Sequence, residues 1–390
     1  METRADVVIV GGGIMGSSLA YWLSCLEPRA SVVVVERDTS YAKASSALSA
    51  ASIRQQFTTP VNIRIAQASI ELLRHVDEML AVEGSKPDIG LSEAGYLYLA
   101  RAAELEPLRR AHAIQVEHGA PIALLDPAQL GARFPWLDTT DVVAGSLGLG
   151  GEGWFDGYSL LTAFARKARS QGVRYIRAEV TGLEVRGTQV NAVCLDNGSR
   201  IPCGQVVNAA GPWARSIAEF AGVELPVVAR RRTVYVIACR TSMKPFPLLI
   251  DPSGFWLRPE GTGFIAGFAP DQDPDDAPLE PEYEMFESVL WPALAGRIPA
   301  FEAAKLERAW AGYYEMNVFD HNGIVGRHPR VANFVFMNGF SGHGMQQGPV
   351  IGRGVAELLV HGRYSSVDLS ALSYERIGLN QPLLELNVIG

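Results

Sequence analysis

The feature that most constrains the fold of this chain is a run of glycines close to its N-terminus. Residues 11–16 read GGGIMG, which matches the pattern G-x-G-x-x-G, and they directly follow the β-branched run at residues 7–10. In this pattern Gly11 permits a tight turn, Gly13 lets backbone N–H groups approach a pyrophosphate, and Gly16 allows a helix to pack closely on a strand. The pattern predicts a buried strand, a phosphate-binding turn and a helix.

The residues after the glycines continue the same unit. We expect a helix over residues 15–26, because apolar residues recur at spacings of three and four, and a second buried strand over residues 32–35. Glu36 follows that strand, 20 residues after Gly16, where dinucleotide-binding folds place a carboxylate against a ribose hydroxyl. An acid there disfavours the 2′-phosphate of NADP. On these residues alone, FAD and NAD are both open.

The composition fits a globular protein that acts on small molecules. With 390 residues, 48% of them hydrophobic, the chain has enough material for a large core and two domains. The net charge of −8 argues against nucleic acid as a partner. The four cysteines lie far apart without a CxxC pair, so we expect no metal site and no disulfide framework. Since neither an export signal nor a membrane span is visible, we expect a soluble, cytoplasmic protein.

The rest of the chain indicates a second sheet. Residues 233–238, 254–258 and 263–268 alternate with the period of two that is typical of antiparallel strands. We further expect helices over residues 60–81 and 159–172, the second capped by Ser159, and a glycine-rich connection at 145–153. A buried strand at 334–337 precedes a helix that ends near residue 359. The predicted fold class is α/β, with a Rossmann-type domain and a second domain of α+β type built on an antiparallel sheet.

Three further blocks, taken with the glycine turn, resemble the superfamily of FAD enzymes that contains D-amino-acid oxidase and sarcosine oxidase. They are residues 44–54, residues 208–213 (NAAGPW) and residues 339–347 (GFSGHGMQQ), the last being the most specific. Small residues after an apolar strand also let backbone approach a flat or phosphorylated ligand. Within the superfamily, the chain is most similar to a mitochondrial branch associated with complex I assembly, and next to the sarcosine oxidase branch.

The resemblance implies that the nucleotide is FAD, held by a discontinuous FAD-binding domain at 1–85, 145–215 and 325–390. Residues 86–144 and 216–324 then form the substrate domain. The residues implied to bind FAD are Gly11, Gly13, Ile14, Met15, Gly16, Glu36, Arg37, Ser45, Ser46, Ser52, Val180, Ala209, Gly211, Trp213, Gly342, His343, Gly344, Met345 and Gln346.

The resemblance also implies the residues of the substrate site. Arg54 matches an arginine that binds the substrate carboxylate, and a guanidinium fork suits that group. Tyr314 and His343 match positions that line the pocket, and Trp256 falls on a strand that covers the flavin ring. Gln346 stands where the sarcosine oxidase branch has a lysine, so the anion pocket is less positive.

Two more departures from the sarcosine oxidase branch bear on the cofactor. Gly312 replaces the cysteine that bonds covalently to FAD, and no histidine occurs between Glu36 and Phe57, so we expect noncovalent FAD. Ile265 replaces a lysine that assists the reaction with O₂. An apolar residue there argues against a rapid reaction with O₂, so a dehydrogenase that passes electrons to another acceptor stays open beside an oxidase.

The reaction that this family implies is oxidation of the C–N bond of a small amino acid or secondary amine, of the N-methyl or D-amino-acid type. A hydride passes to flavin N5, and water hydrolyses the resulting imine. His343 is a candidate for tuning the protonation of the amine. Two alternatives stay open from the sequence: an FAD-dependent hydroxy-acid or polyol dehydrogenase, and a binding or assembly protein that keeps FAD for its structure.

Overall fold

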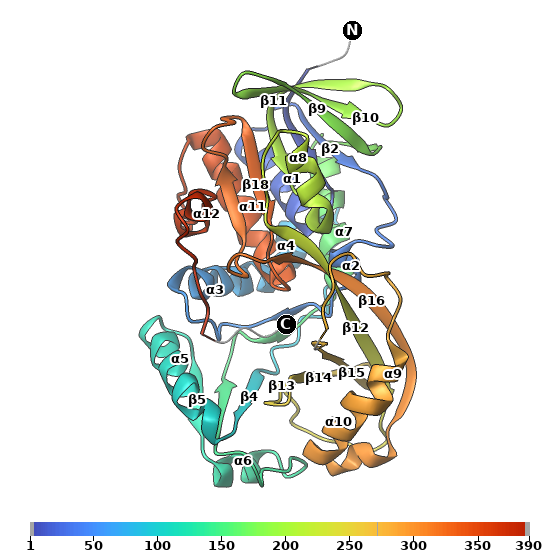
Figure 1. The fold of residues 1–390 in the computed structure, drawn as a ribbon, viewed down its shortest axis with the longest axis vertical. Helices are drawn as coiled ribbons and strands as arrows, with labels where there is room; N and C mark the ends of the chain where they lie inside the picture. Colours follow the sequence, from blue (N-terminus) through green and yellow to red (C-terminus); the bar gives the residue numbers. More distant parts are fainter. Residues whose placement is uncertain (1–3, 271, 387–390) are drawn as a thin grey trace.

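The computed structural model describes residues 4–270 and 272–386, and it contains two eight-stranded sheets, one above the other in Figure 1. The ends of the expected FAD-binding domain, residues 1–3 and 387–390, lie outside the described residues. The chain passes between the two sheets several times, so both are assembled from segments far apart in the sequence.

β-Branched residues form the centre of the upper sheet, as the sequence predicted. Strand β1 (Ala5–Val10) pairs in parallel with β2 (Val32–Glu36) on one side and with β11 (Arg200–Asn208) on the other. The strand order is β17-β18-β11-β1-β2-β8, and β9 and β10 form a hairpin on β11. The remaining strands of this sheet are β8 (Arg174–Arg177), β9 (Val180–Arg186), β10 (Gln189–Leu195), β17 (Ile324–Arg327) and β18 (Phe334–Asn338).

Both faces of the parallel strands are covered, which explains why their sequences are apolar without alternation. Helices α1 (Ile14–Leu26), α7 (Gly157–Ser170) and α11 (Gly344–His361) cover one face and share a core with it. The other face packs against the β9–β10 hairpin and α8 (Ala214–Glu219). Figure 1 shows α1 and α11 beside each other, and side chains from both belong to the same core.

The lower sheet has the order β16-β12-β15-β14-β13-β4-β6-β5. Its pairs are antiparallel except β13 with β4. One face packs on α10 (Trp291–Arg297) and its neighbours, and the opposite face carries Trp256 and Tyr314 toward the upper half of the molecule. The strands are β4 (Tyr96–Ala100), β5 (Ile122–Leu125), β6 (Ala144–Gly148), β12 (Val227–Ala238), β13 (Leu248–Ile250), β14 (Phe255–Glu260), β15 (Gly263–Phe268) and β16 (Lys305–Asn317).

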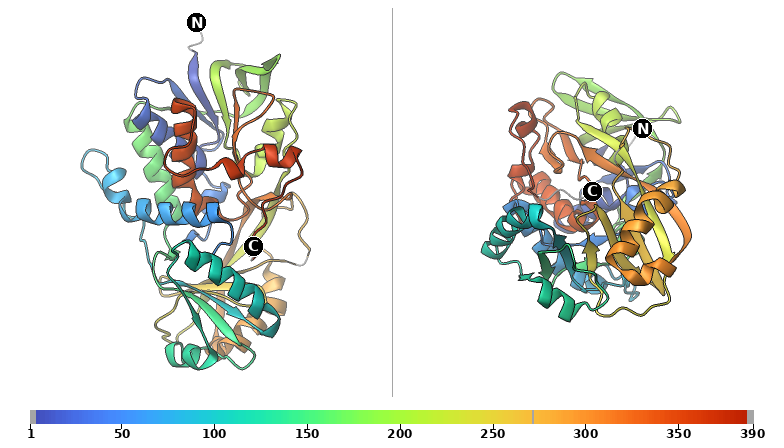
Figure 2. Two further views of the ribbon diagram at one scale, coloured as in Figure 1. Left: turned by 90° about the vertical axis from the view of Figure 1, so that its left-hand side faces the viewer. Right: turned by 60° about the horizontal axis from the view of Figure 1, so that its bottom comes forward.

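The predicted fold class is confirmed. The exact domain boundaries stay a prediction. The chain between these sheets also forms shorter elements, which are α2 (Ser45–Leu48), β3 (Ser52–Ile53), α3 (Pro60–Arg74), α4 (Val76–Met79), α5 (Leu105–Glu117), α6 (Pro127–Arg133) and β7 (Gly153–Trp154). Figure 2 shows α5 and α6 against the lower sheet. Within residues 4–270 and 272–386, no helix is long and apolar enough to cross a bilayer.

Three local predictions were wrong. Residues 145–153 are not only a connection, because they begin with β6, whose glycines leave room for the neighbouring side chains. A Cβ at Gly145 would lie 2.8 Å from Leu130 Cδ2, and one at Gly148 would lie 1.8 Å from Glu152 Oε2. Helix α7 begins at Gly157 and is capped by Asp156, whose carboxylate accepts a hydrogen bond from the Ser159 N–H.

The third difference concerns the helix predicted over residues 60–81. It is divided into α3 and α4 at His75, whose backbone leaves the helical conformation.

Candidate active site

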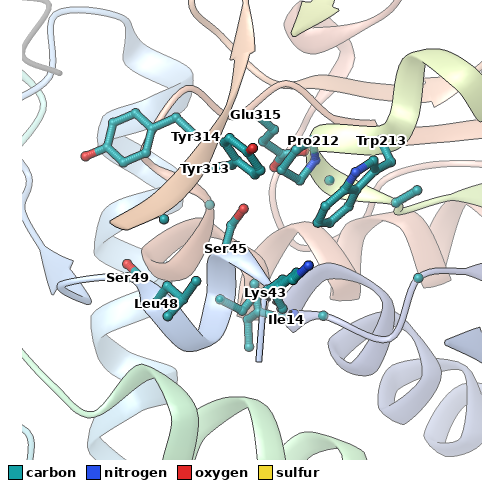
Figure 3. A pocket seen from close by; sticks show the side chains of 18 of the residues that line it. Ile14, Lys43, Ser45, Leu48, Ser49, Pro212, Trp213, Tyr313, Tyr314 and Glu315 are labelled. Carbon is teal, nitrogen blue, oxygen red and sulfur yellow. Dashed lines mark hydrogen bonds between the residues drawn. The ribbon is translucent and has the colours of Figure 1, made fainter. Parts of the chain in front are cut away.

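A long cavity of about 1940 Å³, open solvent at its mouth included, lies where the two sheets meet. The upper sheet and its connections line it with the glycine turn, residues 35–38, the segment before and through α2, and the turn at 209–213. The lower sheet lines it with β12, β14 and β16. Figure 3 shows side chains from α1, α2, the 212–213 turn and β16 around this space.

The glycine turn is built as the sequence predicted. Gly11 has φ +98°, and a Cβ there would lie 2.3 Å from the Ala209 carbonyl oxygen. A Cβ at Gly16 would lie 2.0 Å from the Gly11 carbonyl oxygen, so this glycine lets α1 pack on the turn and does not itself line the cavity. At the start of α1, the Ile14 N–H donates to Ser46 Oγ at 3.0 Å. The positive end of the helix therefore points into the cavity.

Glu36 lies at the end of β2, as expected. Its carboxylate oxygens accept hydrogen bonds from the Gly12 N–H at 2.8 Å and from the Asp38 N–H at 2.9 Å. Arg37 stacks on Trp213, with the guanidinium carbon 3.7 Å from the ring centroid. These residues come from segments far apart in the chain, yet they line the same part of the cavity.

The residues of this cavity fit FAD. Ser45 is an expected ligand, and its hydroxyl is buried against the cavity without a hydrogen-bond partner among the described residues. Such an orphaned polar atom is rare unless a ligand completes it. The glycine-lined wall and the end of α1 suit phosphates. Fifteen of the expected FAD residues line the cavity: Gly11, Gly13, Ile14, Met15, Glu36, Arg37, Ser45, Ser46, Val180, Ala209, Gly211, Trp213, Gly342, Gly344 and Met345.

The other expected FAD residues lie behind the lining. The hydroxyl of Ser52 accepts a hydrogen bond from the Tyr96 hydroxyl at 2.5 Å. His343 and Gln346 are buried beside Arg54 and do not line the cavity. Their assignment to FAD stays a prediction.

Arg54, His343 and Gln346 form one buried cluster. Arg54 Nη2 lies 3.0 Å from His343 Nε2, and the Arg54 backbone N–H donates to Gln346 Oε1 at 3.0 Å. A guanidinium can only donate, so His343 Nε2 is the acceptor. Burial, the Arg54 charge and His321 hold the pKa of His343 well below its usual value. His343 is therefore a neutral imidazole at physiological pH.

This cluster lies directly behind the cavity wall. The Tyr314 ring lines the cavity and rests on Gly342, where a Cβ would lie 2.5 Å from Tyr314 Cε2. His343 follows Gly342 in the chain and contacts Arg54. Arg54 also stacks on Phe57, with the guanidinium carbon 4.0 Å from the ring centroid. A buried cation thus lies close behind the part of the cavity wall that Tyr314 and Gly342 form.

Glu152 is an acid at this cluster that sequence reasoning missed. It is fully buried, and it accepts hydrogen bonds from the Gln55 N–H at 2.6 Å and from Gln56 Nε2 at 2.9 Å. The Gln56 carbonyl in turn accepts from Arg54 Nη1 at 2.7 Å. Burial raises the pKa of Glu152 to about 7, partly opposed by these bonds and by Arg54. The only available signal was an acid within the glycine-rich run at residues 145–153.

Tyr98 and Trp256 complete the surroundings. The Tyr98 ring centroid lies 6.0 Å from the guanidinium carbon of Arg54, and its hydroxyl is buried without a partner among the described residues. Tyr98 was not expected from the sequence. Trp256 lines the cavity. Its indole lies over Gly267 of the neighbouring strand, where a Cβ would be 2.4 Å from Nε1, so this position has room only for glycine.

Ile265 lies next to a positively charged side chain. It pairs directly with Arg258 across strands β14 and β15, and both side chains are buried. The Arg258 guanidinium forms an ion pair with Glu260 and donates to the Ala50 carbonyl at 2.8 Å. A cation is therefore next to Ile265, although a carboxylate partly neutralises it.

Gly312 supports noncovalent attachment of the cofactor. It lines the cavity, and Leu48 fills the space beside it, since a Cβ would lie 3.0 Å from Leu48 Cβ. Among the described residues, those lining the cavity include neither cysteine nor histidine. We therefore expect acid precipitation of the purified protein to leave its FAD in the supernatant, as measured by absorbance. Yellow colour retained in the washed pellet would contradict this.

Comparison with known proteins identifies relatives among the FAD-dependent oxidoreductases. A family model described as FAD dependent oxidoreductase (DAO) matches residues 6–358. FAD-dependent oxidoreductase domain-containing protein 1 of Xenopus laevis is 42% identical, covering 99% of this chain and 85% of that protein. Mitochondrial dimethylglycine dehydrogenase of Rattus norvegicus is 28% identical, covering 97% of this chain and 45% of that protein. The solved structure of L-proline dehydrogenase from P. horikoshii has a TM-score of 0.87 at 27% identity, covering 98% of this chain and all of that one.

Proposed function

The chain belongs to the DAO family of FAD-dependent oxidoreductases, as its motifs predicted, and from this membership we propose that it oxidises the C–N bond of a small amino acid carrying a secondary or tertiary amine. The observation that carries the proposal is the buried Arg54 behind the Tyr314 and Gly342 wall of the cavity. A buried guanidinium needs an anionic partner, and a carboxylate matches its fork. Relatives named for dimethylglycine, sarcosine and L-proline support a secondary or tertiary amine.

FAD, when bound, supplies the acceptor for the hydride, and the chain supplies binding and orientation. In this proposal Arg54 binds the substrate carboxylate, and its bonds to Gln56 and His343 hold the guanidinium plane. Because His343 is neutral and its Nε2 accepts a hydrogen bond from Arg54, Arg54 supplies the positive charge for the carboxylate in this cluster. Trp256 and Tyr314 line the space where the C–H bond would be oriented.

The test is anaerobic reduction of the bound flavin, followed by its visible absorbance. We expect bleaching by at least one of sarcosine, dimethylglycine and L-proline. Lactate and glycerol 3-phosphate serve as matched substrates with a C–OH group in place of the C–N bond, and we expect no bleaching with them. Bleaching by the hydroxy compounds alone would refute the amine proposal in favour of a hydroxy-acid or polyol dehydrogenase. Reduction by dithionite but by no member of the panel would favour a binding protein.

Two further statements stay proposals. The electron acceptor is O₂ or another acceptor, and the buried Arg258, which pairs with Ile265, is a positive charge next to the position where the sarcosine oxidase branch has a lysine. The cytoplasmic location expected from the sequence also stays a prediction.

A further inference from the structure

Glu315 is an acid of the cavity lining that sequence reasoning did not single out. It follows Tyr314 at the end of β16, and Figure 3 shows it among the side chains around the cavity. One carboxyl oxygen, Oε2, accepts the Gly339 N–H at 3.2 Å. The other, Oε1, lies 3.6 Å from the position of a Cβ at Gly344, the first residue of α11. Its carboxyl therefore lies at the glycine wall near the start of α11.

Among the described residues, no Lys, Arg or His side chain forms an ion pair or hydrogen bond with this carboxyl. Gly211 and Gly344 lie beside its oxygens, and its partner on β12 is Ala229. The next residue of β12, Arg230, pairs with Tyr314 and forms ion pairs with Asp273 and Asp275. Burial raises the pKa of Glu315 to about 8, and the backbone N–H groups of Gly339 and Phe340 oppose that rise only in part. At neutral pH the group is therefore a carboxylic acid that has a proton to donate.

We propose that Glu315 is a further FAD-binding residue, which in its neutral form donates a hydrogen bond to an oxygen of the bound cofactor. The cavity wall around Glu315 is the glycine-rich wall that suits phosphates, and FAD carries phosphate and hydroxyl oxygens that accept hydrogen bonds. A neutral acid donates to such oxygens, whereas a carboxylate in the same place would repel a phosphate. This inference concerns the cofactor and does not rest on the proposed substrate.

The proposal makes FAD binding depend on pH in a defined direction. The complex keeps Glu315 protonated, so its pKa is higher in the complex than in the FAD-free protein. Above the pKa of the free protein, binding FAD then requires the uptake of one proton, and affinity falls as the pH rises. For one such group the fall approaches about tenfold per pH unit. Below that pKa the affinity is independent of this group.

The experiment is a titration of the FAD-free protein with FAD, followed by flavin fluorescence, between about pH 6.5 and about pH 9.5. We expect the dissociation constant of the wild type to rise by about tenfold between pH 8.5 and 9.5. In Glu315→Gln, the amide keeps a donor and does not ionise, so we expect its dissociation constant to stay within about threefold of wild type at pH 7 and to change little with pH. Glu302→Gln, at an exposed position, is the matched control and should follow the wild type.

Two outcomes would overturn the proposal. One is an equal pH dependence in the wild type and in Glu315→Gln. The other is loss of FAD binding by Glu315→Gln at pH 7 in a protein that circular dichroism shows to be folded, because an amide donor should then replace the acid. Glu315→Ala gives a third comparison: it removes the donor, so we expect weaker binding at pH 7 without the pH dependence.

Discussion

Arg54→Ala is expected to lower kcat/KM for a carboxylate substrate by about two to three and a half orders of magnitude while FAD stays bound. Arg54 is buried, and it does not line the FAD cavity, so its removal should affect the substrate and not the cofactor. Removing one partner of a buried charged pair costs about 3 to 5 kcal/mol, which corresponds to this loss at about 1.4 kcal/mol per tenfold. The measurement is the rate of anaerobic flavin reduction as a function of substrate concentration.

Arg54→Lys is the matched variant, because it keeps the charge and loses the fork. We expect it to raise KM more than it lowers kcat, since a lysine binds a carboxylate as a point charge. Arg54→Ala also removes the cation that opposes the raised pKa of Glu152, so this acid becomes more fully protonated at pH 7. Thermal unfolding of both variants separates loss of binding from loss of fold. Wild-type rates in Arg54→Ala would show that the carboxylate is held elsewhere.

Gly16→Ala is expected to cost about 3 kcal/mol of stability, at the upper end of what overpacking costs, and to abolish FAD retention. The added Cβ would lie 2.0 Å from the Gly11 carbonyl oxygen and 3.1 Å from Ile9 Cγ2. Because the first of these is backbone, the clash is relieved only when α1 moves away from the phosphate-binding turn. The cavity then loses the helix end that faces the phosphates.

The control for this change is Gly296→Ala. Gly296 is also helical, in α10, but a Cβ there would meet no atom within 4 Å. Alanine is favoured over glycine in a helix interior by about 0.5 to 1 kcal/mol, so we expect this variant to be at least as stable as the wild type. Thermal unfolding and the ratio of flavin to protein absorbance after gel filtration measure both effects. A Gly16→Ala protein that keeps its FAD and its melting temperature would refute the proposed packing role.

Features that depend on neighbours in the chain were predictable. The β-branched runs before Gly11 and before Glu36 form β1 and β2, because a strand buried on both faces needs continuous apolar residues. The strands that contain Trp256 and Ile265 form where they were predicted and pair in antiparallel fashion, but their burial does not alternate, since four successive residues of β15 are buried. Prediction failed at β6, because its glycines indicate a loop on their own. They are tolerated in a strand only because Leu130 and Glu152 occupy the space beside them.

In the candidate site, too, motifs identified some residues, whereas other properties depend on how the chain folds. The sequence identified Arg54 and His343 through motifs, but their contact and the neutral state of the imidazole depend on burial. It gave no reason to select Glu152 or Glu315. Neither acid belongs to a motif, and each acquires its raised pKa from what surrounds it after folding.

The sequence by itself determined the phosphate-binding turn, the parallel strands around it and the fold class, because spacing along the chain encodes each of them. It indicated the FAD-dependent family through the resemblance of its motifs. Only the tertiary structure decided which acids lie beside Arg54 and beside the start of α11, and that Arg258 accompanies Ile265. These contacts join segments separated by tens to hundreds of residues. Their distances depend on strand register and helix packing, and their pKa values depend on the loss of water on burial, which no local pattern specifies.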